Sequence, residues 1–154
     1  MTNGEPMNDI GFELMKLAGK GYCCSQILML LALEIQGREN PDMVRAMSGL
    51  CMGAGNSGGI CGVFTGAACV LALYGAKGAD AEKEAVKLPL MFAELGGWFA
   101  NRLDSGISCT DIIGEDSPRP DPNRCGRLLV DTWGRILEIL VENGFDPANP
   151  DMTL

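Results

Sequence analysis

Residues 51–74 read CMGAGNSGGICGVFTGAACVLALY, and this stretch decides the fold. Its first ten residues are too rich in glycine to form regular structure. Residues 61–74 are apolar on nearly every side, which predicts a helix buried on most of its faces. Gly62 and Gly66 are four residues apart, so they share one helix face and allow a second backbone to approach closely. The stretch therefore predicts a central helix, Cys61 to Tyr74, that follows a glycine-rich loop.

Helical spacing also dominates on both sides of this stretch. Asn40 precedes Pro41, the N-cap and first-residue pattern of a helix start, and Gly37 is suited to end the helix before it. The prolines within residues 115–124 predict a loop there. No strand alternation and no internal repeat is found. The predicted helices are 10–18, 23–36, 41–48, 61–74, 80–87 with a continuation from 89 to 103, a short turn at 109–114, and 125–141.

The predicted fold class is therefore all-α, with about six to seven helices. We expect a single compact domain over residues 1–154, with loose tails at 1–8 and 145–154. A length of 154 residues and an apolar content of 47% are sufficient for one well-buried core.

Composition narrows the classes of partner. The net charge of −8 gives no sign of the basic surface that binds nucleic acid. The uncharged run from residue 50 to 76 is long enough to span a bilayer, but only its second half is continuously apolar, so the sequence favours a buried helix over a membrane span. The first six residues lack the basic and apolar regions of a signal peptide, and we therefore expect a cytoplasmic location.

The chain has seven cysteines and no histidine. Histidine-based acid–base chemistry is thus excluded, and any metal must be bound mainly by thiolates. An odd number of cysteines excludes a complete disulfide framework within one chain. Cys69 lies on an apolar helix face and fits a packing role, and the role of Cys51 is left open. Four positions fall at predicted helix starts, where free N–H groups and the helix dipole lower a thiol pKa; they are Cys23/Cys24, Cys61, Cys109 and Cys125.

The glycine loop contains a G-x-G-x-x-G match, but no strand precedes it and no βαβ unit surrounds it, so we expect no nucleotide. Glycines are better explained by close backbone approach. Consecutive N–H groups in such a loop are also able to point at an anion or at the sulfides of a cluster. The candidate cofactor-binding glycines are Gly53, Gly55, Gly58, Gly59 and Gly62.

Four segments in this order carry a resemblance to a known family. They are Gly21-Tyr22-Cys23-Cys24-Ser25-Gln26, Cys61-Gly62-Val63-Phe64-Thr65-Gly66, Cys109-Thr110-Asp111-Ile112-Ile113-Gly114 and the single Cys125. Over residues 10–141 the chain resembles the family of redox-active proteins named for its C-GCAxxG-C-C pattern. It departs from the pattern at Cys23, where the family usually has another residue, and at Val63, which replaces alanine. Cys51 and Cys69 are additions to the pattern.

The resemblance implies redox activity centred on Cys24, Cys61, Cys109 and Cys125. The family is similar to the non-haem portion of split-Soret cytochromes c, an all-helical dimer associated with an iron–sulfur centre. This chain has no C-x-x-C-H and no histidine, so the resemblance does not extend to haem. The amount of apolar helix surface is compatible with a homodimer, although no interface is predicted.

These observations leave four hypotheses. The first is a redox protein that binds an iron–sulfur cluster through the four cysteines and exchanges electrons with an unknown partner protein, as a carrier more than as a stand-alone enzyme. The second is a metal-free thiol protein or redox sensor with Cys61 as the reactive thiolate and Cys24 or Cys23 as the resolving thiol. The third is a structural zinc site with four cysteine ligands, and the fourth is a helical interaction module. Cluster type, redox potential and partner are not given by the sequence.

Overall fold

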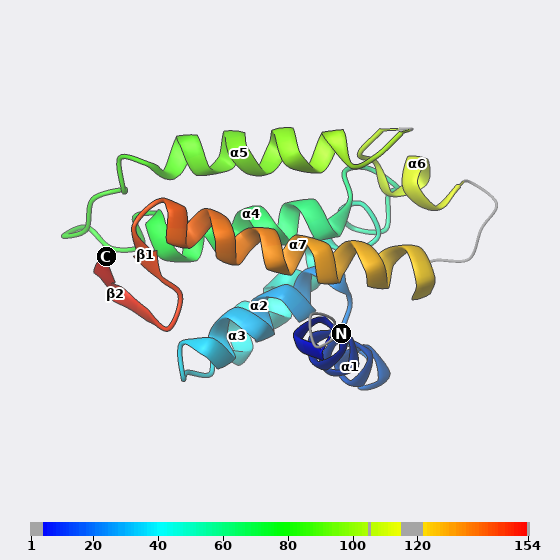
Figure 1. The fold of residues 1–154 in the computed structure, drawn as a ribbon, viewed down its shortest axis with the longest axis horizontal. Coiled ribbons are helices and arrows are strands. Elements are labelled where there is room, and N and C mark those ends of the chain that lie inside the picture. The colour runs from blue at the N-terminus through cyan, green and yellow to red at the C-terminus, as the bar shows by residue number, and fades with distance from the viewer. Residues whose placement is uncertain (1–4, 105, 115–121, 154) are drawn as a thin grey trace.

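The computed structural model describes residues 5–104, 106–114 and 122–153 (Figure 1). Helices make up most of the described chain, and the predicted all-α class is confirmed. The helical elements are α1 Glu5–Gly19, α2 Cys24–Ile35, α3 Pro41–Met47, the 3-10 turn η2 Ser48–Leu50, α4 Gly62–Gly75, α5 Leu88–Asn101, α6 Cys109–Ile113 and α7 Pro122–Glu142.

Helix α4 is the centre of the core, as its apolar sequence predicts. It packs against α2, α5 and α7, and Ala67, Val70 and Leu71 on it are completely buried. Gly66 lies where α2 crosses, and a Cβ atom at this position would come within 2.8 Å of the Cα atom of Ser25. The predicted close approach of two backbones is therefore present, and it joins α4 to α2.

The predicted helix caps are also present. The side chain of Asn40 accepts a hydrogen bond from the Met43 N–H at 3.1 Å and starts α3. Gly37 has a φ of +70° and ends α2, because it lets the Arg38 N–H turn back to the Leu33 carbonyl at 3.0 Å. These local signals fix where α2 and α3 meet.

Three predicted boundaries are wrong. Residues 80–87 do not form a helix: the Glu82 carboxylate accepts the N–H groups of Gly78 and Ala79 at 2.7 and 3.1 Å, a local bonding pattern that competes with helix formation. Helix α7 begins at Pro122 and not at 125, because proline is well suited to the first turn. Helix α1 begins at Glu5 within the expected N-terminal tail. Of the predicted loop 115–124, residues 115–121 lie outside the described residues.

The expected C-terminal tail forms a short hairpin instead. Strands β1 Phe145–Asp146 and β2 Asn149–Thr153 pair antiparallel beside the end of α7 (Figure 1). Phe145 is buried and meets the Tyr74 ring edge-on with 6.5 Å between ring centroids. The Tyr74 hydroxyl donates to the Pro147 carbonyl at 2.7 Å, so contacts with α4 hold a segment that has no strand pattern of its own.

Within the described residues no helix is both long enough and apolar enough to cross a membrane.

Candidate four-cysteine site

The four predicted cysteines lie at helix starts. Cys24 is the first residue of α2, Cys61 is the N-cap of α4, Cys109 is the first residue of α6, and Cys125 is the fourth residue of α7. In Figure 1, α4, α6 and α7 all begin toward the same end of the molecule. The four cysteines that the sequence predicts at helix starts therefore lie at the N-cap or in the first turn of a helix.

Gly62 sets the distance between the starts of α2 and α4. A Cβ atom at Gly62 would be 2.7 Å from the Cys24 Sγ and 2.9 Å from the Leu50 carbonyl oxygen. Both distances are well below ordinary van der Waals contact, so only glycine allows the Cys24 sulfur to lie directly against the first turn of α4. The glycine next to Cys61 thus brings Cys24 and Cys61 to one place.

A backbone pairing joins Cys61 to Cys109. The Cys61 N–H donates to the Ile107 carbonyl at 2.9 Å, and the Cys109 N–H donates to the Gly59 carbonyl at 2.7 Å. Between these bonds Ile60 and Ser108 form an isolated antiparallel bridge. The glycine loop and the start of α6 are therefore held side by side, although almost fifty residues separate them in the chain.

Arg124 ties the start of α7 to α6. Its guanidinium donates to the carbonyl oxygens of Ile112 and Ile113 at 3.1 and 3.3 Å, at the end of α6. These acceptors are the last carbonyls of a helix, which favour a positive charge. The residue before Cys125 thus links α7 to the short helix that begins with Cys109.

The thiols of the four cysteines influence one another electrostatically. Burial, together with negative charge on Cys61, Cys125 and Cys109, raises the pKa of Cys24 to about 12. Burial likewise raises the pKa of Cys61 to about 11, with Cys125 and Cys109 adding to the increase. Cys24 is therefore near enough to the other three for negative charges to repel, and Cys61 is near enough to Cys109 and Cys125.

The expected lowering of the thiol pKa is wrong for Cys24 and Cys61. Its physical basis is present, because the backbone N–H groups of Val63 and Phe64 act to lower the pKa of Cys61, and that of Ser25 acts to lower the pKa of Cys24. Desolvation outweighs them, because Cys61 is only 6% exposed, and negative charge on Cys125 or Cys109 also disfavours its thiolate. The site therefore favours either protonated thiols or thiolates neutralised by a bound cation.

The glycine loop adopts an unusual left-handed conformation. Five consecutive residues, 52–56, have φ between +56° and +77°, and three of them are not glycine. Such a run costs roughly 1–2 kcal/mol for each non-glycine residue. It closes the loop on itself: a Cβ at Gly53 would lie 2.6 Å from the Gly58 carbonyl carbon, and the Gly59 N–H bonds to the Gly53 carbonyl at 3.0 Å.

The N–H groups of the loop are used within the loop. Those of Gly55, Gly58 and Gly59 donate to the carbonyls of Gly49, Met52 and Gly53 at 2.8 to 3.0 Å. Close backbone approach is therefore the role that the structure gives these glycines, and contact with a cofactor stays a prediction.

Cys23 and Cys51 form a disulfide that the sequence analysis missed. The bond joins the N-cap of α2 to the residue that follows η2. Both cysteines are departures from the family pattern. Two extra cysteines can be partners of each other, and this was the one indication of the disulfide in the sequence. Cys69 lies outside this disulfide and is packed against the core, in agreement with its predicted packing role.

Among the described residues, no group of three or more cysteine, aspartate or glutamate side chains is arranged to hold one metal ion. The donor set nevertheless suits one kind of inorganic group. Four thiols at helix starts, of which Cys61 and Cys109 are buried, match in number the thiolate ligands of an iron–sulfur cluster.

The fold and the site together define a class: an all-α protein that gathers cysteine thiols at the starts of its helices. The family described as "Putative redox-active protein (C_GCAxxG_C_C)" matches residues 22–139, and the chain belongs to this family. Membership supports a redox role. No curated protein and no solved structure gives a significant match to the chain.

Proposed function

We propose that this protein binds an iron–sulfur cluster through Cys24, Cys61, Cys109 and Cys125 and exchanges electrons with a protein partner. The observation that carries the proposal is geometric: the four cysteines stand at four separate helix starts, Gly62 lets the Cys24 sulfur lie against the start of α4, and a backbone pairing joins Cys61 to Cys109. A buried group of this kind is unfavourable as four thiolates unless a cationic centre compensates the charge. One-electron transfer is the chemistry that such a cluster supplies when it is bound.

The surrounding backbone has defined roles in this proposal. The N–H groups of Ser25, Val63 and Phe64 favour negative charge on the sulfurs of Cys24 and Cys61. Hydrogen bonds to ligand sulfur withdraw negative charge and raise the potential of a cluster. Gly62 supports the site by letting the Cys24 sulfur lie against the first turn of α4. The same residues therefore position the ligands and adjust their charge.

Zinc is the main rival metal. A single zinc ion would draw four sulfurs to about 3.8 Å from one another, because Zn–S bonds of about 2.3 Å point to the corners of a tetrahedron. An iron–sulfur cluster holds its thiolates farther apart, because they are divided among two or four iron atoms. The cluster proposal therefore needs four thiols that face one space, and it does not need them to touch.

The test is a set of single serine substitutions analysed after anaerobic purification. Cys24→Ser, Cys61→Ser, Cys109→Ser and Cys125→Ser are each expected to lose most of the bound iron and the broad visible absorption of a cluster. Cys69→Ser is the matched control, because Cys69 packs on the same helix as Cys61 and stands outside the site. It is expected to keep both signals.

Far-UV circular dichroism of each variant separates loss of the site from loss of the fold. Full iron content in two or more of the four variants would contradict the proposed ligand set. Zinc without iron in the anaerobic wild type would replace the cluster with the structural zinc site.

A further inference from the structure

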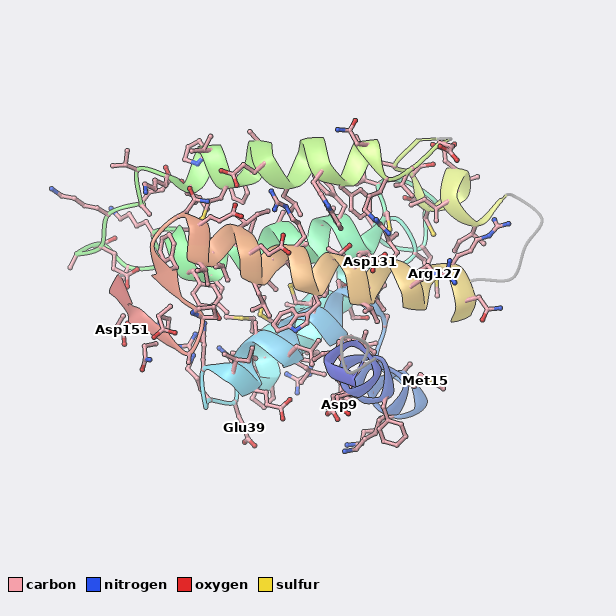
Figure 2. All side chains as sticks on the ribbon, viewed as in Figure 1. Asp9, Met15, Glu39, Arg127, Asp131 and Asp151 are labelled. Atoms are coloured by element: carbon pink, nitrogen blue, oxygen red, sulfur yellow. A yellow bond between two sulfur atoms is a disulfide. The ribbon has the colours of Figure 1, made fainter. Side chains whose placement is uncertain are left out.

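The Cys23–Cys51 disulfide lies in the wall of an open cavity of about 900 Å³. The cavity is formed by α1, the start of α2 and the first half of α7. Figure 2 labels residues on both sides of it, with Met15 on α1 and Arg127 and Asp131 on α7. A disulfide that faces a cavity of this size is accessible to a small molecule, in contrast to one sealed in a core.

The two sulfurs of the disulfide have different surroundings. Cys23 is partly exposed, whereas Cys51 is only 5% exposed. The Cys51 Sγ is 2.9 Å from the hydroxyl oxygen of Ser25, a fully buried residue whose hydroxyl also bonds to the Met47 carbonyl at 2.7 Å. The single hydroxyl proton of Ser25 is donated to the Met47 carbonyl in the disulfide form, and the hydroxyl lies close enough to Cys51 to turn and donate to its sulfur once that sulfur is a thiolate. Cys23 is therefore the sulfur open to attack, and Cys51 is the sulfur with a buried donor to receive it as a leaving thiolate.

The walls of the cavity indicate what fits it. Phe12 and Met15 at its edge are 72% and 75% exposed, and most of the remaining lining is apolar. The charged residues in the lining are one arginine, Arg127, and one aspartate, Asp131, which oppose each other in sign. A neutral molecule with an apolar body therefore suits the cavity better than an anionic thiol does.

We propose that the Cys23–Cys51 disulfide exchanges electrons with a slender aliphatic dithiol, of the dihydrolipoyl kind, that enters this cavity. A slender molecule is required because Cys51 is recessed, and a dithiol because its second sulfur completes the reaction. The inference rests on the disulfide, the cavity and Ser25. Cys24 and Cys125, two of the proposed cluster ligands, line the same cavity, so the exchange is tested on protein without a bound cluster as well.

The reaction is a balanced exchange of two electrons and two protons. One thiol of the substrate loses its proton to solvent and attacks the Cys23 Sγ. The disulfide bond breaks, and Cys51 leaves with the electron pair as a thiolate that Ser25 stabilises and solvent protonates. The second thiol of the substrate then loses its proton to solvent and attacks the substrate sulfur bound to Cys23. Cys23 is released as a thiolate and takes up a proton, and the substrate leaves as a cyclic disulfide.

The test uses the full-length oxidised protein and two reagents, dihydrolipoamide and dithiothreitol. Aliquots are quenched with acid, the thiols are alkylated, and the modification of Cys23 and Cys51 is followed by mass spectrometry. Each rate is divided by the rate of the same reagent with oxidised glutathione. We expect dihydrolipoamide to exceed dithiothreitol by at least about tenfold on this scale, the effect of burying about two methylene groups.

Three variants locate the effect. Phe12→Ser and Met15→Ser are expected to remove most of the preference for dihydrolipoamide without slowing dithiothreitol. Ser25→Ala is expected to slow both reagents, because the leaving thiolate loses its donor. Val86→Ser is the matched control, since Val86 is 96% exposed and is not part of the cavity lining. Circular dichroism confirms that each variant is folded.

Equal normalised rates for the two reagents would overturn the inference, and so would a preference that survives both Phe12→Ser and Met15→Ser. Faster reduction by a folded thioredoxin than by dihydrolipoamide would replace the small dithiol with a protein partner. Alkylation of Cys23 and Cys51 before any reductant is added would show that the two cysteines are not disulfide-bonded, and it would overturn the inference. Iron is measured in the same samples, and the preference for dihydrolipoamide is expected in a chelator-treated preparation as well. Failure of the cluster proposal and failure of the dithiol proposal are therefore separate results.

Discussion

Replacement of Gly62 by alanine is the most direct test of how the fold builds the four-cysteine site. The new Cβ atom would lie 2.7 Å from the Cys24 Sγ and 2.9 Å from the Leu50 carbonyl oxygen. Ordinary contact begins at 3.4 Å, so the sulfur must retreat by about 0.7 Å and the carbonyl by about 0.5 Å. The substitution adds one methyl group, and that methyl group displaces a proposed ligand.

The expected cost follows from these distances. Overpacking of this kind destabilises a protein by about 1–3 kcal/mol, because rotamers and backbone must shift. The gain in helix propensity from glycine to alanine is at most about 1 kcal/mol and is smaller at Gly62, the first residue of α4. We expect a net loss near 2 kcal/mol, which lowers the Tm of a chain of this length by about 4–8 °C. The bound iron is expected to fall as well, because a ligand sulfur is displaced.

The assay is thermal unfolding followed by circular dichroism, with iron content measured on the same samples. Gly134→Ala is the control, because a Cβ at Gly134 in the middle of α7 meets no atom within 4 Å. That variant is expected to gain up to about 1 kcal/mol and to keep its iron. If Gly62→Ala matched Gly134→Ala in both stability and iron, the account of Gly62 as the spacer between α2 and α4 would be refuted.

Three further predictions concern other parts of the molecule. Tyr74→Phe removes the hydrogen bond to the Pro147 carbonyl, and it is expected to lower the free energy of unfolding in urea by about 0.5–1.5 kcal/mol. Amide exchange in the β1–β2 hairpin is expected to increase, and unchanged exchange would contradict the role of Tyr74. Asn40→Ala removes the α3 cap and is expected to lower the free energy of unfolding by about 1 kcal/mol, whereas Asn40→Ser should retain most of that stability. The metal-free protein is expected to lose stability as pH rises above about 9, because unfolded thiols ionise near their ordinary value of 9.0 whereas folded Cys24 and Cys61 stay protonated up to a pKa of about 12 and about 11. The free energy of unfolding is expected to fall by about 1.4 kcal/mol per pH unit for each thiol. Urea unfolding at about pH 8 and pH 10 should show this fall in the wild type and a smaller fall in Cys24→Ser.

Local patterns made the helical part of the fold predictable. The central helix, the caps at Asn40 and Gly37 and the cysteines at helix starts all depend on residues within one or two turns of each other. The close approach of α2 and α4 was also predictable, because Gly62 and Gly66 share one face. Each of these features is encoded in consecutive sequence.

Features that depend on distant contacts were not predictable. The hairpin at the C-terminus is held by Tyr74, about seventy residues earlier in the chain. The Cys23–Cys51 disulfide spans 28 residues, and it forms because α2, α3 and η2 fold back on one another. The direction of the pKa shift at Cys24 and Cys61 depends on burial, which the dipole of a single helix start does not reveal.

The site shows how two opposing effects are combined. Backbone N–H groups at a helix start favour a thiolate, but burial and neighbouring thiols favour the protonated form. In the proposed function a bound cationic centre would remove the second effect and leave the first, so the arrangement would hold protons when empty and ligate when filled.

The measurement that tests the central claim most directly is the content of iron and acid-labile sulfide in protein purified without oxygen, read together with its visible spectrum. The account predicts iron and sulfide in near-equal, near-stoichiometric amounts and a broad visible absorption that disappears in Cys24→Ser and Cys61→Ser. A colourless protein without iron or sulfide after anaerobic purification and attempted reconstitution with both would contradict it.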